Sequence, residues 1–193
     1  MANRIGEGAG ASAVVMRVDI TERKLAEQEL NRLAYQDALT GLPSRNGFVH
    51  ALSEQLGQTG WQPNAMVMMF DIRRHRDIND SYGYAIGDRL LQAIGERITE
   101  VAGEDAVVGR IGGDEFVIYL PDLGEALASR QRDRIARAFE RPFAIDDLRI
   151  DAVARFGYTL LGSEQRATEE LLREAELALF ELTASEGGND WCA

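Results

Sequence analysis

A near-continuous apolar run, AMVMMFDI at residues 65–72, ends in an acid. Runs of this length without polar interruption are typical of a central strand that is buried on both faces. Two further short apolar runs, at residues 106–111 and 115–120, flank a pair of glycines, and this arrangement predicts a hairpin. The pattern therefore predicts a sheet whose central strand delivers Asp71 to one edge.

Residues 21–36, TERKLAEQELNRLAYQ, predict a helix. Charges occur throughout this segment, and an apolar stripe at helical spacing comprises Leu25, Ala26, Leu30, Leu33 and Ala34. The stripe fits either a helix packed on its own domain or a stem that pairs with its copy in a dimer. The preceding segment 13–20, AVVMRVDI, predicts a short strand.

The remaining segments alternate between helical and extended patterns. Ser44 is placed to cap a helix that runs to about Leu56. Residues 73–88 are polar and predict a loop, whereas residues 89–102 have helical periodicity. Further along, the sequence predicts a helix within 123–143 that stops before Pro142, one or two strands within 148–161 and a last helix at 168–184. This order predicts an α+β fold, with helices on a central, mostly antiparallel sheet.

Charge and cysteine content narrow the possible partners. The 193 residues carry a formal net charge of −11, which disfavours nonspecific binding to nucleic acid or to anionic membranes. The single cysteine, Cys192, leaves no internal disulfide framework and fits a reducing compartment. No apolar run approaches the roughly 20 residues of a membrane span. We therefore expect a cytoplasmic protein with no nucleic-acid partner and no direct membrane insertion.

The predicted hairpin carries acids at its tip. Gly112 and Gly113 meet the backbone needs of a tight turn, and Asp114 and Glu115 follow at once. A solvated tip is one interpretation, and a metal or phosphate site is the other, since glycine allows close approach of a ligand. If Asp71 lies beside this tip, the three carboxylates repel one another unless a cation is present. Ligation by oxygen alone suits Mg²⁺.

Three ordered blocks extend this pattern along the chain. Residues 112–116 spell Gly-Gly-Asp-Glu-Phe, residues 37–48 read DALTGLPSRNGF, and residues 70–91 read FDIRRHRDINDSYGYAIGDRLL. Together they resemble the GGDEF family of diguanylate cyclase domains, which the segment EAELALF at 174–180 matches more loosely. The resemblance covers about residues 37–190. It implies a fold similar to the nucleotide cyclase and polymerase palm arrangement, and the formation of cyclic di-GMP from two GTP by two facing domains.

The resemblance also implies roles for the acids. Asp71 and Asp114 correspond to ligands of Mg²⁺ or Mn²⁺, assisted by the carbonyl of Ile72. Glu115 corresponds to a base or charge stabiliser near the ribose 3′-hydroxyl. Asp114 and Glu115 are thus the expected catalytic residues.

Further positions correspond to the substrate site. Gly112 and Gly113 let the turn lie against the phosphates, and Arg76 stands where the family has a phosphate-binding lysine. Asn79 and Asp88 correspond to residues that contact guanine, and a carboxylate suits the N1–H and N2 amino donors of that base. The alternative for Asn79 and Asp88 is ordinary turn and capping duty.

Several positions depart from the family pattern. Arg73 replaces the second acid of the second block, and Thr183 takes the place of a lysine on the last helix. Loss of that cation weakens stabilisation of the triphosphate, so we expect reduced cyclase activity. The alternative is a catalytically weak or inactive GTP-binding module that controls an adjacent EAL phosphodiesterase domain. The organisation expected is residues 1–20 as the end of a PAS-like sensor segment, 21–36 as a stem helix and 37–193 as the GGDEF domain.

Overall fold

The computed structural model describes residues 21–121, 125–184 and 191–192, without the side chains of 25–28, 125–129, 182–184 and 191–192. The helices are α1 (Thr21–Tyr35), α2 (Arg45–Thr59), α3 (His75–Tyr82), α4 (Tyr84–Ala102), α5 (Glu125–Arg137) and α6 (Thr168–Ala184). The strands are β1 (Met66–Ile72), β2 (Val107–Gly112), β3 (Glu115–Leu120), β4 (Phe143–Ile145), β5 (Leu148–Ile150), β6 (Ala154–Leu160) and β7 (Trp191–Cys192). The strand predicted at 13–20 lies outside the described residues.

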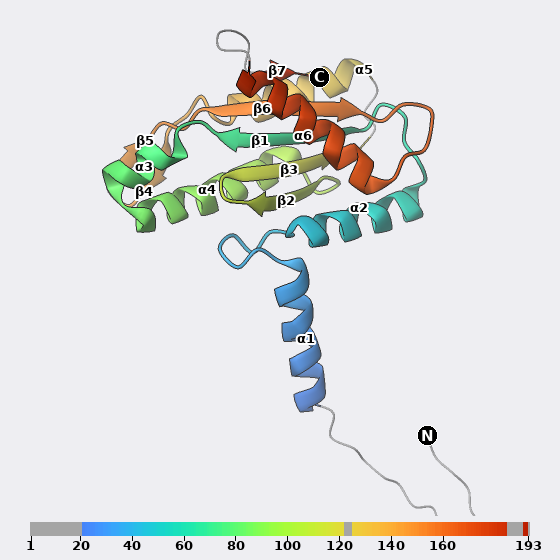
Figure 1. Ribbon diagram of the computed structural model, residues 1–193, viewed down its shortest axis with the longest axis horizontal. Coiled ribbons are helices and arrows are strands. Elements are labelled where there is room, and N and C mark those ends of the chain that lie inside the picture. The colour runs from blue at the N-terminus through green and yellow to red at the C-terminus, as the bar shows by residue number, and fades with distance from the viewer. Residues whose placement is uncertain (1–20, 122–124, 185–190, 193) are drawn as a thin grey trace, which may run out of the picture. The chain divides into compact units, whose positions relative to one another are not determined.

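Two compact units divide the chain, residues 1–32 and residues 33–193. The second unit holds a five-stranded sheet in the order β2-β3-β1-β6-β7. Its pairs are antiparallel, apart from the parallel contact between β6 and β7. The predicted α+β fold with a mostly antiparallel sheet is confirmed, and the apolar run at 65–72 forms the middle strand (Figure 1).

Two apolar clusters cover the two faces of this sheet. On one face, Phe48 and Leu52 of α2 and Leu171 of α6 pack against alternate β1 residues such as Val67 and Met69. On the other face, residues of α4 and the β4–β5 hairpin pack against the intervening β1 positions, including Met68, Phe70, Leu90, Ile94 and Phe143. Because both faces are covered, β1 is apolar at nearly every position, as the sequence pattern indicates.

The prediction of a loop at residues 73–88 is wrong, because most of this segment is helical. Helix α3 occupies His75–Tyr82, and α4 begins at Tyr84 rather than near residue 89. Gly83 alone separates the two helices, with φ of 86°. Helix α3 is short and polar and has no buried residue. Its sequence therefore lacks the apolar stripe by which a helix is predicted.

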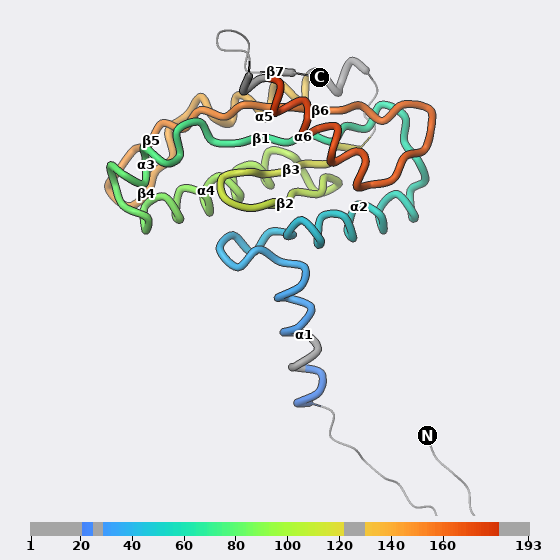
Figure 2. Tube along the Cα trace, viewed as in Figure 1, coloured from blue at the N-terminus to red at the C-terminus, as the bar shows by residue number. Residues whose placement is uncertain are grey.

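The direction of the strands brings the segment at 70–91 and the signature at 112–116 to the same end of the sheet. Figure 2 shows that the C-terminal end of β1 and the turn between β2 and β3 lie at the same end of the sheet. The register pairs Asp71 with Glu115 and Asp71 with Arg155 across the two neighbouring strands. Helix α3 starts from this same end, directly after β1.

Helix α6 packs very closely on β6, and this contact yields a stability prediction. A Cβ added at Gly157 would lie 2.2 Å from the Leu179 nitrogen and 2.7 Å from the Ala175 carbonyl oxygen. We expect Gly157→Ala to lower the free energy of unfolding by about 2 kcal/mol, because backbone atoms of α6 must move. Urea denaturation measures this. Gly162→Ala is the matched control, since no atom lies within 4 Å of its added Cβ. Equal stability of the two variants would contradict the prediction.

Candidate functional site

The turn between β2 and β3 is tighter than the sequence indicates. Gly112 pairs with Glu115, so the turn consists of Gly113 and Asp114, and the expectation that both glycines form it is corrected. A register shift between Arg110 and Gly112 precedes it. Gly113 has φ of 53°, a left-handed conformation that favours glycine at this position. Asp114 is thereby held at the tip, and Glu115 already belongs to β3.

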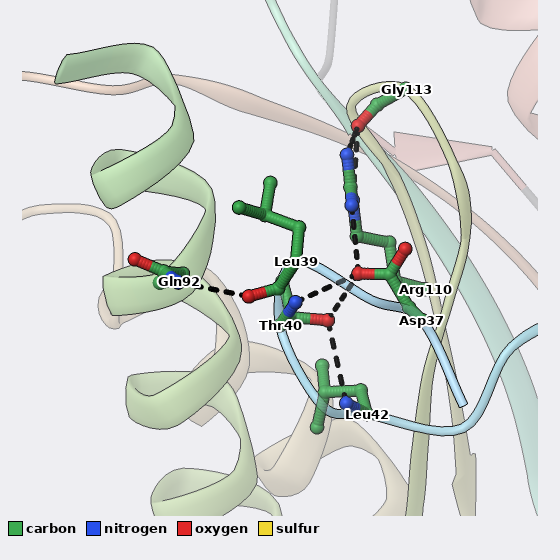
Figure 3. Close-up of polar contacts among 7 residues, drawn as sticks. All are labelled: Asp37, Leu39, Thr40, Leu42, Gln92, Arg110 and Gly113. Carbon is green, nitrogen blue, oxygen red and sulfur yellow. Dashed lines mark hydrogen bonds and ion pairs between the residues drawn. The ribbon is translucent and has the colours of Figure 1, made fainter. Parts of the chain in front are cut away.

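A buried arginine fixes the position of this tip. The Arg110 guanidinium donates to the carbonyl oxygen of Gly113 through Nε, at 3.1 Å, and to Oδ1 of Asp37 through Nη1, at 2.7 Å (Figure 3). The amide and hydroxyl of Thr40 donate to the same Asp37 oxygen, at 2.9 Å and 2.7 Å. Only 9% of the Arg110 side chain is exposed. The block at 37–48 and the signature at 112–116 are therefore joined by a sheltered ion pair.

Backbone contacts complete this support. The Arg110 amide donates to the Pro43 carbonyl at 2.9 Å, and Gln92 of α4 donates to the Leu39 carbonyl at 2.9 Å. Gly109 passes so close to Pro43 that an added Cβ would lie 2.9 Å from its carbonyl oxygen. The loop preceding α2 is thus attached to both the hairpin and α4 (Figure 3).

Acidic side chains gather where the tip meets the end of β1. Glu115 lies directly opposite Asp71 in the register, and Asp114 precedes it in the turn. Burial raises the pKa of the Glu115 carboxyl, and the charges of Asp114, Glu176 and Asp71 raise it further, while Arg45 lowers it. Glu115 thus lies among carboxylates whose negative charges oppose its ionisation.

Arg155 compensates part of this charge, and sequence reasoning did not identify it. Its Nε donates to Oδ1 of Asp71 at 2.8 Å, and its Nη2 donates to Oδ2 of the same carboxylate. The hydrogen bond to Asp71 raises the pKa of Arg155, and the charges of Asp71 and Asp114 add to this effect. The two side chains face each other from β1 and β6, with 14% of Asp71 and 25% of Arg155 exposed.

This arrangement does not fit a divalent cation as it stands. Both oxygens of Asp71 accept from Arg155, and a positive guanidinium lies beside them. Among the described residues, no group of three or more His, Cys, Asp or Glu side chains is placed to hold a metal ion. Ile72 ends β1 with its side chain buried, next to Asp71. Metal ligation by Asp71, Ile72 and Asp114 stays a prediction, and it requires Arg155 to move.

Two buried polar atoms mark a second part of the site, at α3 and the start of α4. Oδ1 of Asn79 and Nε2 of His75 are buried, and neither has a hydrogen-bond partner within the described part of the chain. A Cβ added at Gly87 would lie 1.8 Å from this Asn79 oxygen and 3.4 Å from this His75 nitrogen. Buried polar atoms without partners are rare in folded proteins, so this pair is an unusual feature of the segment between β1 and α4.

Two more of the predicted substrate residues, Asp88 and Arg76, are exposed. Asp88 lies near the start of α4 with an exposed side chain. The Arg76 side chain is 91% exposed on α3, and its Nε lies 3.9 Å from Oδ2 of Asp80. The contacts of Asp88 and Arg76 with a nucleotide stay predictions, and the side chain of Thr183 lies outside the described residues.

Comparison with known families agrees with the signature and the fold. Residues 34–189 match the family described as "Diguanylate cyclase, GGDEF domain". The chain belongs to the GGDEF family. None of the helices described for it is long and apolar enough to cross a membrane.

Relatives of this GGDEF domain include proteins of several named activities. The signaling protein YkoW of Bacillus subtilis is 31% identical over 172 residues, which cover 88% of this chain and 22% of YkoW. The cyclic di-GMP phosphodiesterase PdeR of Escherichia coli is 27% identical over 187 residues, which cover 95% of this chain and 28% of PdeR. The chain thus spans between 22% and 28% of the length of these curated relatives.

Solved structures share the fold. The GGDEF domain of YfiN from Pseudomonas aeruginosa superimposes with a TM-score of 0.72 at 29% identity, covering 82% of this chain and 95% of that one. A diguanylate cyclase/phosphodiesterase from Caldicellulosiruptor saccharolyticus gives a TM-score of 0.71 at 26% identity, covering 80% and 90%. The family and the layered α+β fold are therefore established for this chain.

The buried pair of Asp37 and Arg110 leads to a stability prediction. Burial tends to raise the pKa of Asp37, but hydrogen bonds from Thr40 and Arg110 outweigh it, and the net pKa is lowered. Asp37→Asn leaves the Arg110 charge sheltered without a counterion, so we expect a loss of about 3 kcal/mol at pH 7, measured by urea denaturation. Because the folded carboxyl has the lower pKa, this difference should persist above about pH 4 and shrink as the pH falls further.

The control is Asp146→Asn, which removes an ion pair to Arg89 whose side chains are more than half exposed. An exposed pair contributes under about 1 kcal/mol. Equal losses in the two variants would show that the Arg110 pair has no special structural role.

The acidic cluster leads to a prediction of opposite sign. Because the pKa of Glu115 is raised in the folded state, its ionised form destabilises the fold, and this cost disappears as the pH falls below the carboxyl's ordinary pKa. Glu115→Gln should therefore raise the melting temperature at pH 7 by about 2 °C, and the gain should vanish near pH 4. Thermal unfolding across pH measures it, with the exposed Glu104→Gln as control. A gain independent of pH would contradict the electrostatic origin.

Proposed function

We propose that this domain binds GTP at the hairpin tip and acts as a diguanylate cyclase of reduced turnover. The observation that carries the proposal is the register of β1 and β3, which sets Asp71 opposite Glu115 and next to the intact Gly112–Glu115 tip. The tip is held in place by Arg110, so its backbone and acids are already arranged before a ligand arrives. Preorganised groups of this kind stabilise developing charge at little reorganisation cost.

Each residue of the site has a proposed part in this reaction. Glu115 acts near the ribose 3′-hydroxyl as base or charge stabiliser, and burial together with the neighbouring acids raises the pKa of its carboxyl, which makes it a stronger proton acceptor than an exposed glutamate. Gly112 and Gly113 would allow close approach of the phosphates, and Asp114 lies in the same turn as Gly113. The family's usual Mg²⁺ or Mn²⁺ would neutralise the triphosphate, held by Asp71, Asp114 and the Ile72 carbonyl once Arg155 is displaced.

Base recognition is proposed for α3 and the start of α4. The buried Asn79 Oδ1 supports this, because it is an acceptor without a partner among the described residues. Asn79 and Asp88 would accept from the N1–H and N2 amino donors of guanine. Arg76, which is exposed, is free to reach a phosphate and retains the charge of the family's lysine, although its planar group has a different shape.

Formation of cyclic di-GMP requires two GTP, so the proposed enzyme works as a homodimer. The second copy would present its own hairpin tip to the first, through facing GGDEF domains or pairing of α1. We further propose that PAS and EAL domains accompany this one in the full-length protein.

A second candidate function is a GTP-binding regulatory module for an EAL phosphodiesterase domain. The pair between Asp71 and Arg155 favours it, because a carboxylate neutralised by arginine is a poor starting point for metal-dependent turnover. The printed names of PdeR and of the relative NbdA from Pseudomonas aeruginosa, a cyclic di-GMP phosphodiesterase, are compatible with such a role.

Calorimetry with GTP and product analysis test the proposal. With Mg²⁺ present, we expect the wild type to bind GTP and to form cyclic di-GMP slowly, at a rate that rises with protein concentration. Asp114→Asn should weaken GTP binding at least tenfold, corresponding to about 1.4 kcal/mol, and abolish product formation. Asp147→Asn, at an exposed position, is the matched control.

The outcomes separate the two candidates. GTP binding without product at any protein concentration would favour the regulatory module. Absence of GTP binding, or equal affinity in the wild type and Asp114→Asn, would contradict the assignment of the hairpin tip as the nucleotide site.

A further inference from the structure

We propose that Arg155 is an internal competitor of the divalent cation, which occupies Asp71 and keeps the empty nucleotide site from binding metal. The inference rests on the proposed function only in taking Asp71 as a metal-ligand position. It concerns a residue of β6 that lies outside the sequence blocks of the site. The competitor would be displaced when a nucleotide brings its own metal ion and negative charge.

The geometry of the contact supports competition. Arg155 and Asp71 are direct cross-strand partners, and Nε and Nη2 of the guanidinium engage Oδ1 and Oδ2 of the carboxylate, with Nε at 2.8 Å. A planar guanidinium matches both oxygens at once. Mg²⁺ or Mn²⁺ bound to either oxygen would sit at about 2.1 Å, beside the fixed positive charge. The guanidinium therefore opposes the metal both by position and by charge.

The surroundings make this a preformed contact rather than an occasional surface pair. The side chains of Asp71 and Arg155 are 14% and 25% exposed. Their Cα positions are fixed opposite each other by adjacent strands of the sheet. Asp114 also acts electrostatically on the Arg155 guanidinium. Arg155 thus experiences the two carboxylates that the family pattern assigns to the metal.

Metal binding without nucleotide tests this directly. The full chain is titrated with Mn²⁺, and free Mn²⁺ is measured by electron paramagnetic resonance. Arg155→Ser should bind one Mn²⁺ at least tenfold more tightly than the wild type, because the competing charge is gone. The double variant Asp71→Asn with Arg155→Ser should lose this gain. Arg149→Ser, which removes an exposed arginine from β5, should behave as the wild type.

Folding is checked by thermal unfolding of each variant, since Arg155→Ser leaves Asp71 without this partner. Arg155→Gln provides a second test, because it removes the charge and keeps much of the side chain. Tighter Mn²⁺ binding in either folded variant, dependent on Asp71, supports the proposal. Equal Mn²⁺ affinity in the wild type and both folded variants would overturn it, as would a gain that survives Asp71→Asn.

The readout separates this inference from the proposed function. Mn²⁺ affinity is measured with no nucleotide, so a chain that fails to bind GTP can still show the effect of Arg155. Conversely, GTP binding and cyclic di-GMP formation with unchanged Mn²⁺ affinity in the Arg155 variants would retain the function and reject the competitor.

Discussion

The contact of Arg110 with Asp37 and Gly113 is the interaction on which the site depends. The hairpin of β2 and β3 lies at the edge of the sheet, so it pairs with another strand, β1, on one side only. Its tip would be free to bend if its glycines were the only constraint. Arg110 removes that freedom, because one buried guanidinium binds both the turn's own carbonyl and an acid from the loop before α2. The position of Asp114 and Glu115 thus depends in part on Asp37, which lies 73 positions before Arg110 in the sequence.

Segments whose burial is uniform could be predicted from sequence. The run at 65–72 becomes β1 because both faces of the sheet are covered, so nearly every position selects an apolar side chain. The hairpin at 106–120 could be predicted because glycines interrupt two apolar runs. Residues 73–88 misled because α3 buries none of its residues and starts from Arg74 in a left-handed conformation, with φ of 56°. Polar composition alone does not distinguish such a helix from a loop.

The charges of the site were only partly predictable, for a physical reason. Acids at Asp71, Asp114 and Glu115 lie within recognisable blocks, so their convergence followed from the expected pairing of two strands. Arg155 lies in β6, and its contact with Asp71 depends on the register of β1 against β6. A shift of one residue would turn Arg155 to the other face of the sheet. No local sequence feature fixes that register, so the structure was needed to find the pair.

Arg110 and Arg155 lie in the same sheet, but their ion pairs differ in exposure and in partners. Arg110 is 9% exposed and binds the backbone carbonyl of Gly113 in addition to Asp37. Arg155 is more exposed, at 25%, and its partner Asp71 lies where the triphosphate is proposed to bind. Breaking a sheltered pair costs about 3–5 kcal/mol when nothing takes the place of the lost partner. If a nucleotide binds with its metal ion as proposed, it would supply both charges at once, a cation for Asp71 and phosphate oxygens for Arg155. Under the proposed function, exchange of partners rather than loss of a pair would make an arginine at this position compatible with an intact signature at the hairpin tip.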